Sequence, residues 1–315
     1  MSSILRLPLH RLMAIALLVL GMLVSTDRTA AADVMPVVAS FSILGDLTRQ
    51  IGGERVEVHT LVGPGADAHV YQPTPADAKK LARARLVIVN GLGFEGWIDR
   101  LIKSSGYRGK LVVASQGVNA IRLERTDVDK HGSREHAHTD DLDPHAWQDL
   151  ANGRRYVDTI AAALVDVDPA GRTVYQANAA RLNREIGALD SRIRSTLGAL
   201  PAARRKVVTS HDAFAYFGRA YGFRFIAPVG ISTDAEPSAA DIAAIIRQIR
   251  KEKIRAMFIE NIADPRLLER ISRESGARVG GTLSSDSLAT AGSPADTYLG
   301  MMRENTRTIE AALAD

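Results

Sequence analysis

Residues 143–152 read DPHAWQDLAN, and the whole chain can be understood as arranged around this stretch. Pro144 fixes its own backbone and favours extended geometry in the residue before it, so His145 is predicted on a stiff turn just ahead of a helix. A stiff turn suits a metal ligand. The alternative is a solvated loop histidine followed by a helix N-terminus, since most histidines bind no metal. Three other segments with similar local chemistry, which contain His69, His211 and Asp286, bear on this choice.

The composition is that of an ordinary globular protein, long enough for two cores. The chain has 315 residues, of which 46% are hydrophobic and 24% are charged. Its formal net charge is +4, and part of this excess lies in the first 32 residues. Such mild basicity gives no reason to predict binding to nucleic acid. The basic clusters at 204–206 and 247–253 are predicted to be solvated faces.

The N-terminus has the pattern of a secretory signal. Arg6 and Arg11 precede an apolar run over 12–24, and three alanines at 30–32 follow. The run has 13 residues, whereas a spanning helix needs about 20. We therefore expect a signal peptide over residues 1–32 and a mature chain that begins at Asp33.

The chain contains no cysteine. This excludes disulfides, thiolate metal sites and lipid attachment through a thiol. The expectation is a soluble periplasmic protein without a lipid anchor. Any metal ion would have to be held by nitrogen and oxygen.

Short apolar strands alternate with amphipathic helices along the chain, which predicts parallel sheets with crossover helices. The fold class is α/β, with two lobes that each contain a parallel sheet flanked by helices. The predicted strands are 35–41, 55–62, 86–89 and 111–114, the last two buried, and then 206–209, 223–229, 254–259 and 277–283. The predicted helices include 42–51, 75 onward, 94–105, 156–165, 213–221, 238–251, 267–275 and 296–314.

A much longer helix is predicted over 169–200, where apolar residues recur at steps of three and four. About 30 residues give a rod of ~45 Å, which could join two lobes. The predicted division is an N-terminal lobe over 33–165, a linking helix over 166–200 and a C-terminal lobe over 201–315. Dimerisation through a coiled coil is the alternative for the long helix.

Residues 126–141 interrupt the alternation. They contain almost no apolar residue and carry His131, His136 and His138 among several acids. This composition is typical of a surface loop. An auxiliary metal-collecting loop is the alternative, since histidine-rich tracts bind metals.

The candidate ligands are placed where parallel sheets bind their ligands, beyond the carboxyl ends of strands. His69 follows the strand 55–62, His211 follows 206–209, and Asp286 follows 277–283. Three imidazoles and one carboxylate would make a closed tetrahedral shell suited to zinc. Taken singly, His211 could be a buried imidazole beside a capping serine, and Asp286 could be a helix N-cap.

Four segments together carry a family resemblance: GADAHVYQPTPAD, DPHAWQD, TSHDAFAYFGRAYGF and SSDSL. In this order they resemble the metal-binding solute receptors of ABC importers, the zinc and manganese group that includes TroA-like proteins. The resemblance implies that His69, His145, His211 and Asp286 are the metal ligands. It also implies that the long helix is the backbone helix between the lobes, and that the 126–141 loop is a short form of a histidine-rich loop.

The resemblance further implies a function and partners. The chain would capture Zn²⁺ as its bound substrate and pass it to an inner-membrane ABC permease, with a periplasmic metal chaperone as a further partner. We expect a monomer and no enzyme activity. Manganese members usually carry glutamate where this chain has His211, so zinc is favoured. A manganese-preferring receptor of the same family is the alternative, because members with histidine at this position also take Mn²⁺.

A zinc-dependent hydrolase is the alternative from another class. If Asp286 were a general base, three histidines would remain around a metal with one open position. Glu260 is the other candidate base, but it is interpreted as ending a strand. No HExxH pair supports a hydrolase. An adhesin on the same fold is a third possibility.

Overall fold

The computed structural model describes residues 34–123 and 142–314. Everything described below belongs to one compact unit, Val34–Asp315. The predicted signal peptide and the loop with His131, His136 and His138 lie outside the described residues. Among the described helices, none combines the length and the apolar character needed to cross a membrane.

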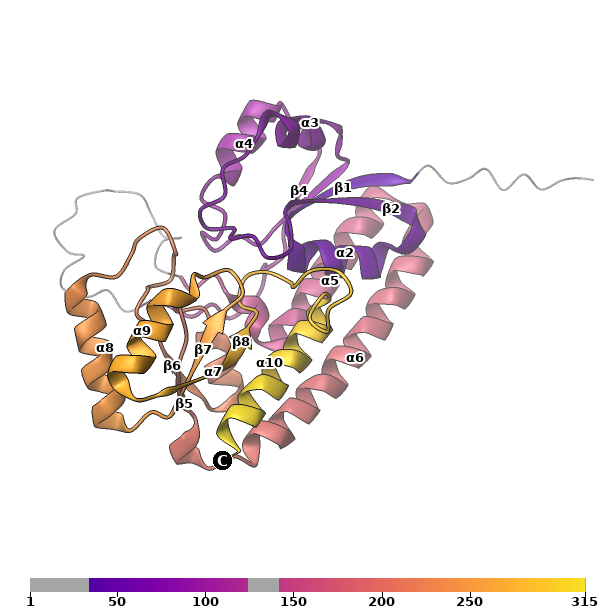
Figure 1. The fold of residues 1–315 in the computed structure, drawn as a ribbon. Coiled ribbons are helices and arrows are strands. Elements are labelled where there is room, and N and C mark those ends of the chain that lie inside the picture. The colour runs from indigo at the N-terminus through magenta and orange to yellow at the C-terminus, as the bar shows by residue number, and fades with distance from the viewer. Residues whose placement is uncertain (1–33, 124–141, 315) are drawn as a thin grey trace, which may run out of the picture. The chain divides into compact units, whose positions relative to one another are not determined.

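The first half of the described chain is built on a four-stranded parallel sheet in the order β2-β1-β3-β4. In Figure 1, α2 lies just below this sheet, and α3 and α4 lie above it. The elements are β1 (Met35–Phe41), α2 (Ser42–Gly52), β2 (Val56–Val62), α3 (Pro75–Arg83), β3 (Leu86–Val89), α4 (Ile98–Ser105) and β4 (Lys110–Val113).

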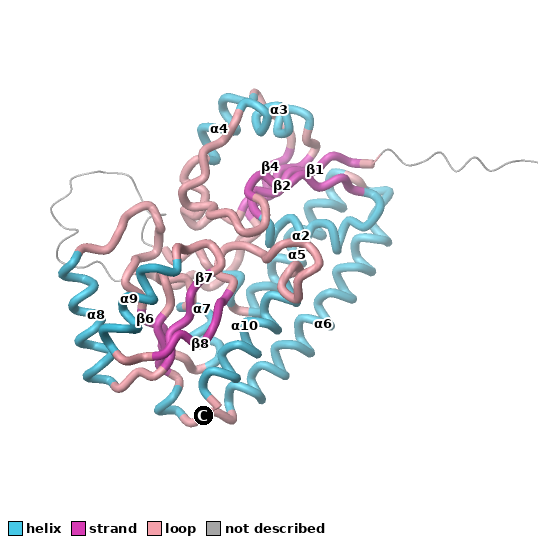
Figure 2. The backbone as a smooth tube through the Cα atoms, in the orientation of Figure 1, coloured by secondary structure: helices cyan, strands magenta, loops and turns pink. Residues whose placement is uncertain are grey.

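The second half repeats this plan with a parallel sheet in the order β6-β5-β7-β8. The two sheets are separate (Figure 2). The elements are β5 (Lys206–Val208), α7 (Ala215–Tyr221), β6 (Arg224–Ile226), α8 (Ala239–Glu252), β7 (Ala256–Glu260), α9 (Pro265–Ser275), β8 (Arg278–Leu283) and α10 (Tyr298–Leu313). The predicted fold class is confirmed.

Between the two sheets the chain runs through α5 (Leu150–Val167) and the long helix α6 (Arg172–Gly198). α6 packs on α2 and α5 of the first half and on α7 and α10 of the second (Figure 1). Its apolar stripe is buried within the chain at Tyr175, Ala179, Leu182, Ile186, Leu189, Ile193 and Leu197. Because these side chains are already covered, the stripe is not free to form a coiled coil.

One hydrophobic cluster continues through both halves. It runs from Val37 in β1 through Ile160 and Leu182 in the linking helices to Met301 in α10. A smaller cluster lies under β5 and β7, against α8 and α9. The two halves share one core, and packing against it positions the loops that follow the strands of both sheets. The lobe boundaries expected from the sequence stay predictions.

Two local predictions are wrong. The last strand of the first sheet was expected to be buried, but Leu111 and Val113 are 44% and 39% exposed. Among the described strands, β4 pairs with β3 alone and forms an edge, so one of its faces stays open. The helix expected from Phe94 begins only at Ile98. Residues 94–97 form turns instead, in which the buried Glu95 carboxylate accepts hydrogen bonds from the Ser40 hydroxyl and from the backbone N–H groups of Asn90 and Gly91.

Candidate metal centre

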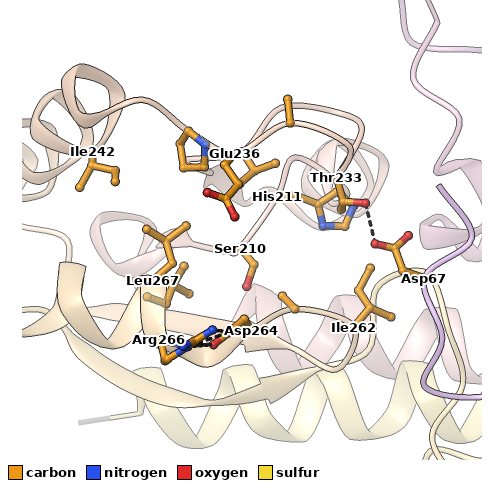
Figure 3. A pocket seen from close by; sticks show the side chains of 15 residues that line it. Asp67, Ser210, His211, Thr233, Glu236, Ile242, Ile262, Asp264, Arg266 and Leu267 are labelled. Carbon is orange, nitrogen blue, oxygen red and sulfur yellow. Dashed lines mark hydrogen bonds and ion pairs between the residues drawn. The ribbon is translucent and has the colours of Figure 1, made fainter. Parts of the chain in front are cut away.

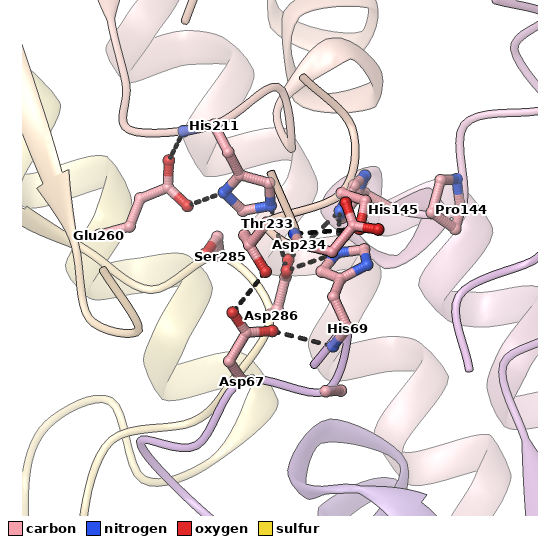
Figure 4. Close-up of polar contacts among 12 residues, drawn as sticks. Asp67, His69, Pro144, His145, His211, Thr233, Asp234, Glu260, Ser285 and Asp286 are labelled. Carbon is pink, nitrogen blue, oxygen red and sulfur yellow. Dashed lines mark hydrogen bonds and ion pairs between the residues drawn. The ribbon is translucent and has the colours of Figure 1, made fainter. Parts of the chain in front are cut away.

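Four loops converge between the two halves (Figure 4). His69 lies between β2 and α3, His145 directly before the short 3₁₀ helix Ala146–Gln148, His211 after β5, and Asp286 after β8. One ligand atom from each of these side chains lies within 4.8 Å of the other three. All four residues singled out in the sequence are therefore brought to one point.

The separations between these atoms suit a small tetrahedral ion. The Nε2 atoms of His69 and His211 each lie 3.1 Å from Asp286 Oδ2. His145 Nε2 lies 3.3 Å from His69 Nε2 and 3.6 Å from Asp286 Oδ1. Donors bound to zinc at about 2.0–2.1 Å stand about 3.3 Å apart in a tetrahedron. The four side chains are at most 5% exposed.

A buried carboxylate stands behind two of the three imidazoles. Asp143 Oδ1 lies 2.8 Å from His145 Nδ1 and also accepts the backbone N–H of His145. Glu260 Oε2 lies 2.5 Å from His211 Nδ1, and its Oε1 accepts the His211 backbone N–H at 2.8 Å. A carboxylate at Nδ1 keeps the proton on that nitrogen and leaves the Nε2 lone pair for a metal.

Sequence reasoning missed this role of Glu260. Glu260 does end strand β7, as expected, but its side chain is buried and turned toward His211. β7 lies next to β5 in the sheet, and His211 follows β5 directly. An acid at the carboxyl end of a buried strand, beside a strand that ends in a candidate ligand, was the available signal.

The electrostatics of the site match a place for a divalent cation. Burial lowers the pKa of His145, but Asp286 and Asp143 outweigh it and raise this pKa to about 9. Burial also lowers the pKa of His211, yet Glu260 and Asp286 raise it well above its usual range. Burial raises the pKa of Asp286, but His145 and His211 lower it well below its usual range. The buried carboxylates thus favour positive charge at this point, carried by protons or by a metal.

The segment around Asp286 is tied to the first half of the chain. The carbonyl of Ser285 accepts hydrogen bonds from Trp147 Nε1 at 2.9 Å and from Gln148 Nε2 at 2.8 Å. The Ser42 hydroxyl accepts from the backbone N–H of Leu288 at 2.9 Å. These contacts hold the backbone on both sides of Asp286 in place.

The structure bears on the alternative interpretations of His211 and Asp286: His211 is a buried imidazole, as one of them expected, but neither Ser210 nor Asp286 caps a helix. The next helix after Asp286 is α10, and its N-cap is Thr297. The Ser210 hydroxyl accepts the backbone N–H of Glu260 instead of capping a helix. The hydrolase alternative required Asp286 to stand away from the metal, but its Oδ2 is 3.1 Å from two of the three candidate nitrogens.

Aromatic rings close one side of the site. The ring centroid of Phe94 lies 4.8 Å from that of His69 and 6.0 Å from that of His145. Trp147 packs on Phe94 at 4.8 Å and on His145 at 5.4 Å. This wall excludes water from that side and restricts the orientation of both imidazoles.

Comparison with known proteins identifies relatives over nearly the whole chain. A sequence model of the family described as zinc-uptake complex component A, periplasmic, matches residues 37–312. The chain is 32% identical over 304 residues to the manganese-binding lipoprotein MntA of Halalkalibacterium halodurans, covering 96% of this chain and 97% of MntA. It is 31% identical over 294 residues to the manganese ABC transporter substrate-binding lipoprotein PsaA of Streptococcus pneumoniae, covering 91% and 92%.

Among solved structures, the fold matches the periplasmic zinc-binding protein TroA of Treponema pallidum. The TM-score is 0.80 at 31% identity, and the match covers 89% of this chain and 100% of TroA. The family and these relatives are substrate-binding receptors, so the prediction that the chain is not an enzyme is confirmed. The relatives differ in their metal, and the comparison does not single out zinc.

The prediction of a protein without a lipid anchor is wrong on this comparison. MntA, PsaA and further relatives are named as lipoproteins. The prediction depended on the absence of cysteine, which speaks only against attachment through a thiol. An extracellular or periplasmic location is otherwise supported.

Proposed function

Because the chain belongs to the family of zinc-uptake complex component A, periplasmic, we propose that it captures one Zn²⁺ ion with His69, His145, His211 and Asp286 and delivers it to the membrane permease of an ABC importer. The observation that carries this proposal is the convergence of three imidazole nitrogens on one buried carboxylate, at spacings that fit a tetrahedral ion.

The donor set supports zinc as the preferred ion. Three of the four donors are imidazole nitrogens, which suit zinc, whereas manganese favours oxygen donors and a larger coordination number. The carboxylates of Asp143 and Glu260 contact the Nδ1 atoms of His145 and His211. They therefore orient these two imidazoles and are not counted among the metal donors. Four protein donors at these spacings would complete a tetrahedral shell, whereas a catalytic zinc keeps one position for water.

A manganese receptor is the second candidate, and one observation favours it. Asp286 turns Oδ2 toward His69 and His211 and Oδ1 toward His145. A carboxylate that presents both oxygens can bind in bidentate fashion and serve a larger ion. Two of the relatives named above carry manganese in their names.

The remaining parts of the proposal concern export and partners. Residues 1–32 would direct export, and the protein would work in the periplasm as a monomer. Family members work with ABC permease and ATPase components, and we include a zinc-carrying periplasmic chaperone as a donor of the ion. The burial of the α6 stripe supports the monomer.

The test is a competition titration of the metal-free protein with zinc and manganese, together with single alanine variants. His69→Ala, His145→Ala and His211→Ala should each weaken zinc binding by orders of magnitude. His59→Ala is the matched control, because His59 lies on β2 with a 41% exposed side chain that pairs with Glu57. Tighter binding of manganese than zinc would replace the zinc assignment, and undiminished affinity in a ligand variant would remove that residue from the site.

A further inference from the structure

A cavity of about 400 Å³ in the second half of the chain borders the metal centre (Figure 3). Its walls come from α8, α9, the loops that follow β5, β6 and β7, and, through Asp67, the loop that follows β2 in the first half. Of the four candidate ligands, His211 lines this cavity, and His69, His145 and Asp286 do not. The cavity therefore gives access to one ligand from one direction.

Two of the other ligands, His145 and Asp286, are backed by packed groups, whereas His69 packs on Phe94 and its side chain is 5% exposed. His145 has Asp143 and Trp147 behind its ring. Asp286 follows Ser285, whose carbonyl accepts two buried hydrogen bonds from the first half. Displacing these groups would break buried hydrogen bonds and leave their donors without acceptors. An ion that reached the site from those sides would have to cross this barrier.

One hydrogen bond joins the two halves of the chain at the edge of the cavity. The Thr233 hydroxyl, on the loop after β6, donates to Asp67 Oδ2 at 2.5 Å. Asp67 belongs to the first half, and its Oδ1 accepts the backbone N–H of His69 at 2.8 Å. Both Asp67 and Thr233 line the cavity (Figures 3 and 4). A single hydroxyl–carboxylate contact at the edge of a cavity, where water can replace it, opens at a smaller cost than the buried contacts on the other sides.

The polar groups along the cavity suit a cation. Glu236 and Asp67 line it, and among the described residues neither has a cation within ion-pair distance. The carboxylate of Asp264 is already paired with Arg266. Ile242 and Leu267 provide apolar walls. A divalent cation that leaves water needs oxygen ligands, and Glu236 followed by Asp67 would supply them in sequence.

We propose that this cavity is the route by which the divalent cation enters and leaves the site, that His211 is the first ligand to bind it, and that the Thr233–Asp67 hydrogen bond is the inner gate. This inference rests on the proposed function. The proposed function concerns the affinity for the ion, which the four ligands set. The further inference concerns the rates at which the ion binds and leaves, which the cavity sets.

The first test places larger side chains in the walls of the cavity, so that the proposed path of the ion becomes narrower. Ala235→Trp, at an exposed lining position, and Ala263→Phe, at a partly buried one, should slow both zinc association and chelator-driven release. Since both directions cross the same barrier, both rates should fall by about tenfold while the equilibrium dissociation constant stays within about twofold. Ala203→Trp is the matched control, because Ala203 is exposed and lines a different cavity among basic residues of the same half, beside Arg204 and Arg278.

The outcomes are separable. If both folded variants bind and release zinc at the rates of the unmodified protein, the route is wrong. A change in affinity at an unchanged association rate also overturns it, because the substitution then acts on the site. If the unmodified protein binds no metal, the proposed function fails and the route falls with it. Zinc binding with unchanged rates in the variants overturns the route alone.

The second test addresses the gate. Thr233→Val keeps the shape of the side chain and removes the hydroxyl donor, so association and release should both become faster with little change in affinity. Thr233→Ser retains the hydroxyl and should behave like the unmodified protein. Unchanged rates in Thr233→Val would show that this contact is not the barrier.

Discussion

Glu260 is the residue whose contribution is easiest to isolate. Its Oε1 accepts the backbone N–H of His211, and its Oε2 stands 2.5 Å from His211 Nδ1. Glu260→Gln keeps an oxygen for the backbone N–H but removes the charge that sets the imidazole tautomer. Loss of such a partner typically costs about 10–100-fold in metal affinity.

We therefore expect Glu260→Gln to fold normally and to bind zinc about 10–100-fold more weakly in a competition assay. Glu274→Gln is the control, since Glu274 is a 45% exposed helix residue that pairs with Arg270. Equal zinc affinity in Glu260→Gln and the unmodified protein would argue against a role for this carboxylate in orienting His211.

A second prediction at the residue scale concerns protons. In the metal-free protein the pKa of His145 is raised to about 9, so its ring carries an extra proton at pH 7. A metal needs a free Nε2, and binding at pH 7 should therefore release protons. Apparent zinc affinity should rise with pH from 7 toward 9, by up to about tenfold per pH unit for each proton released.

Calorimetric titration in two buffers with different ionisation enthalpies, at the same pH, measures this release. Zinc binding with no net proton release at pH 7 would contradict the protonated state of the metal-free site. His145→Ala serves as the control, since it should release fewer protons as well as bind more weakly.

At the scale of elements, the segment between β8 and α10 is held by α2. The Ser42 hydroxyl, at the start of α2, accepts the buried N–H of Leu288. Ser42→Ala would leave that N–H without its acceptor, which costs about 1–3 kcal/mol. Urea denaturation of the metal-free protein should show this loss in the free energy of unfolding.

Ser191→Ala is the comparison for this prediction, because Ser191 is exposed on α6 and its hydroxyl bonds only within the helix. It should change stability by less than about 0.5 kcal/mol. If the two alanine variants unfold at the same urea concentration, the hydrogen bond between Ser42 and Leu288 does not contribute to the free energy of unfolding.

The elements themselves were largely predictable, and their ends were not. Strands such as β1 and helices such as α6 follow from apolar periodicity, which local sequence carries. The late start of α4 accompanies the burial of Glu95, whose carboxylate accepts the hydroxyl of Ser40 from β1. The exposure of β4 depended on its place at the edge of a sheet. Neither is a property of the segment alone.

For the whole molecule, metal binding should increase the free energy of unfolding. A ligand that binds only the folded state adds about 4 kcal/mol at a thousandfold excess over its dissociation constant. For a chain of this size we expect zinc to raise the melting temperature by about 10 °C, and a chelator to reverse it.

His211→Ala should lose most of this thermal shift, whereas His59→Ala should keep it. The measurement is a melting curve with and without zinc for each variant. A full shift in His211→Ala would mean that zinc stabilises the protein through some other place on the chain.

Residue order by itself determined much of this protein. Apolar spacing specified an α/β chain with a long central helix, because periodicity is a local property. The four candidate ligands were recognisable from the short segments that contain them, DPHAW above all.

Tertiary structure alone decided which groups stand behind those ligands. Glu260 and His211 are 49 residues apart, and Thr233 and Asp67 are 166 residues apart. Their contacts exist because two sheets are packed around one helix and bring the carboxyl ends of their strands to the same point. A local sequence pattern cannot predict these contacts, because they result from the packing of the whole fold.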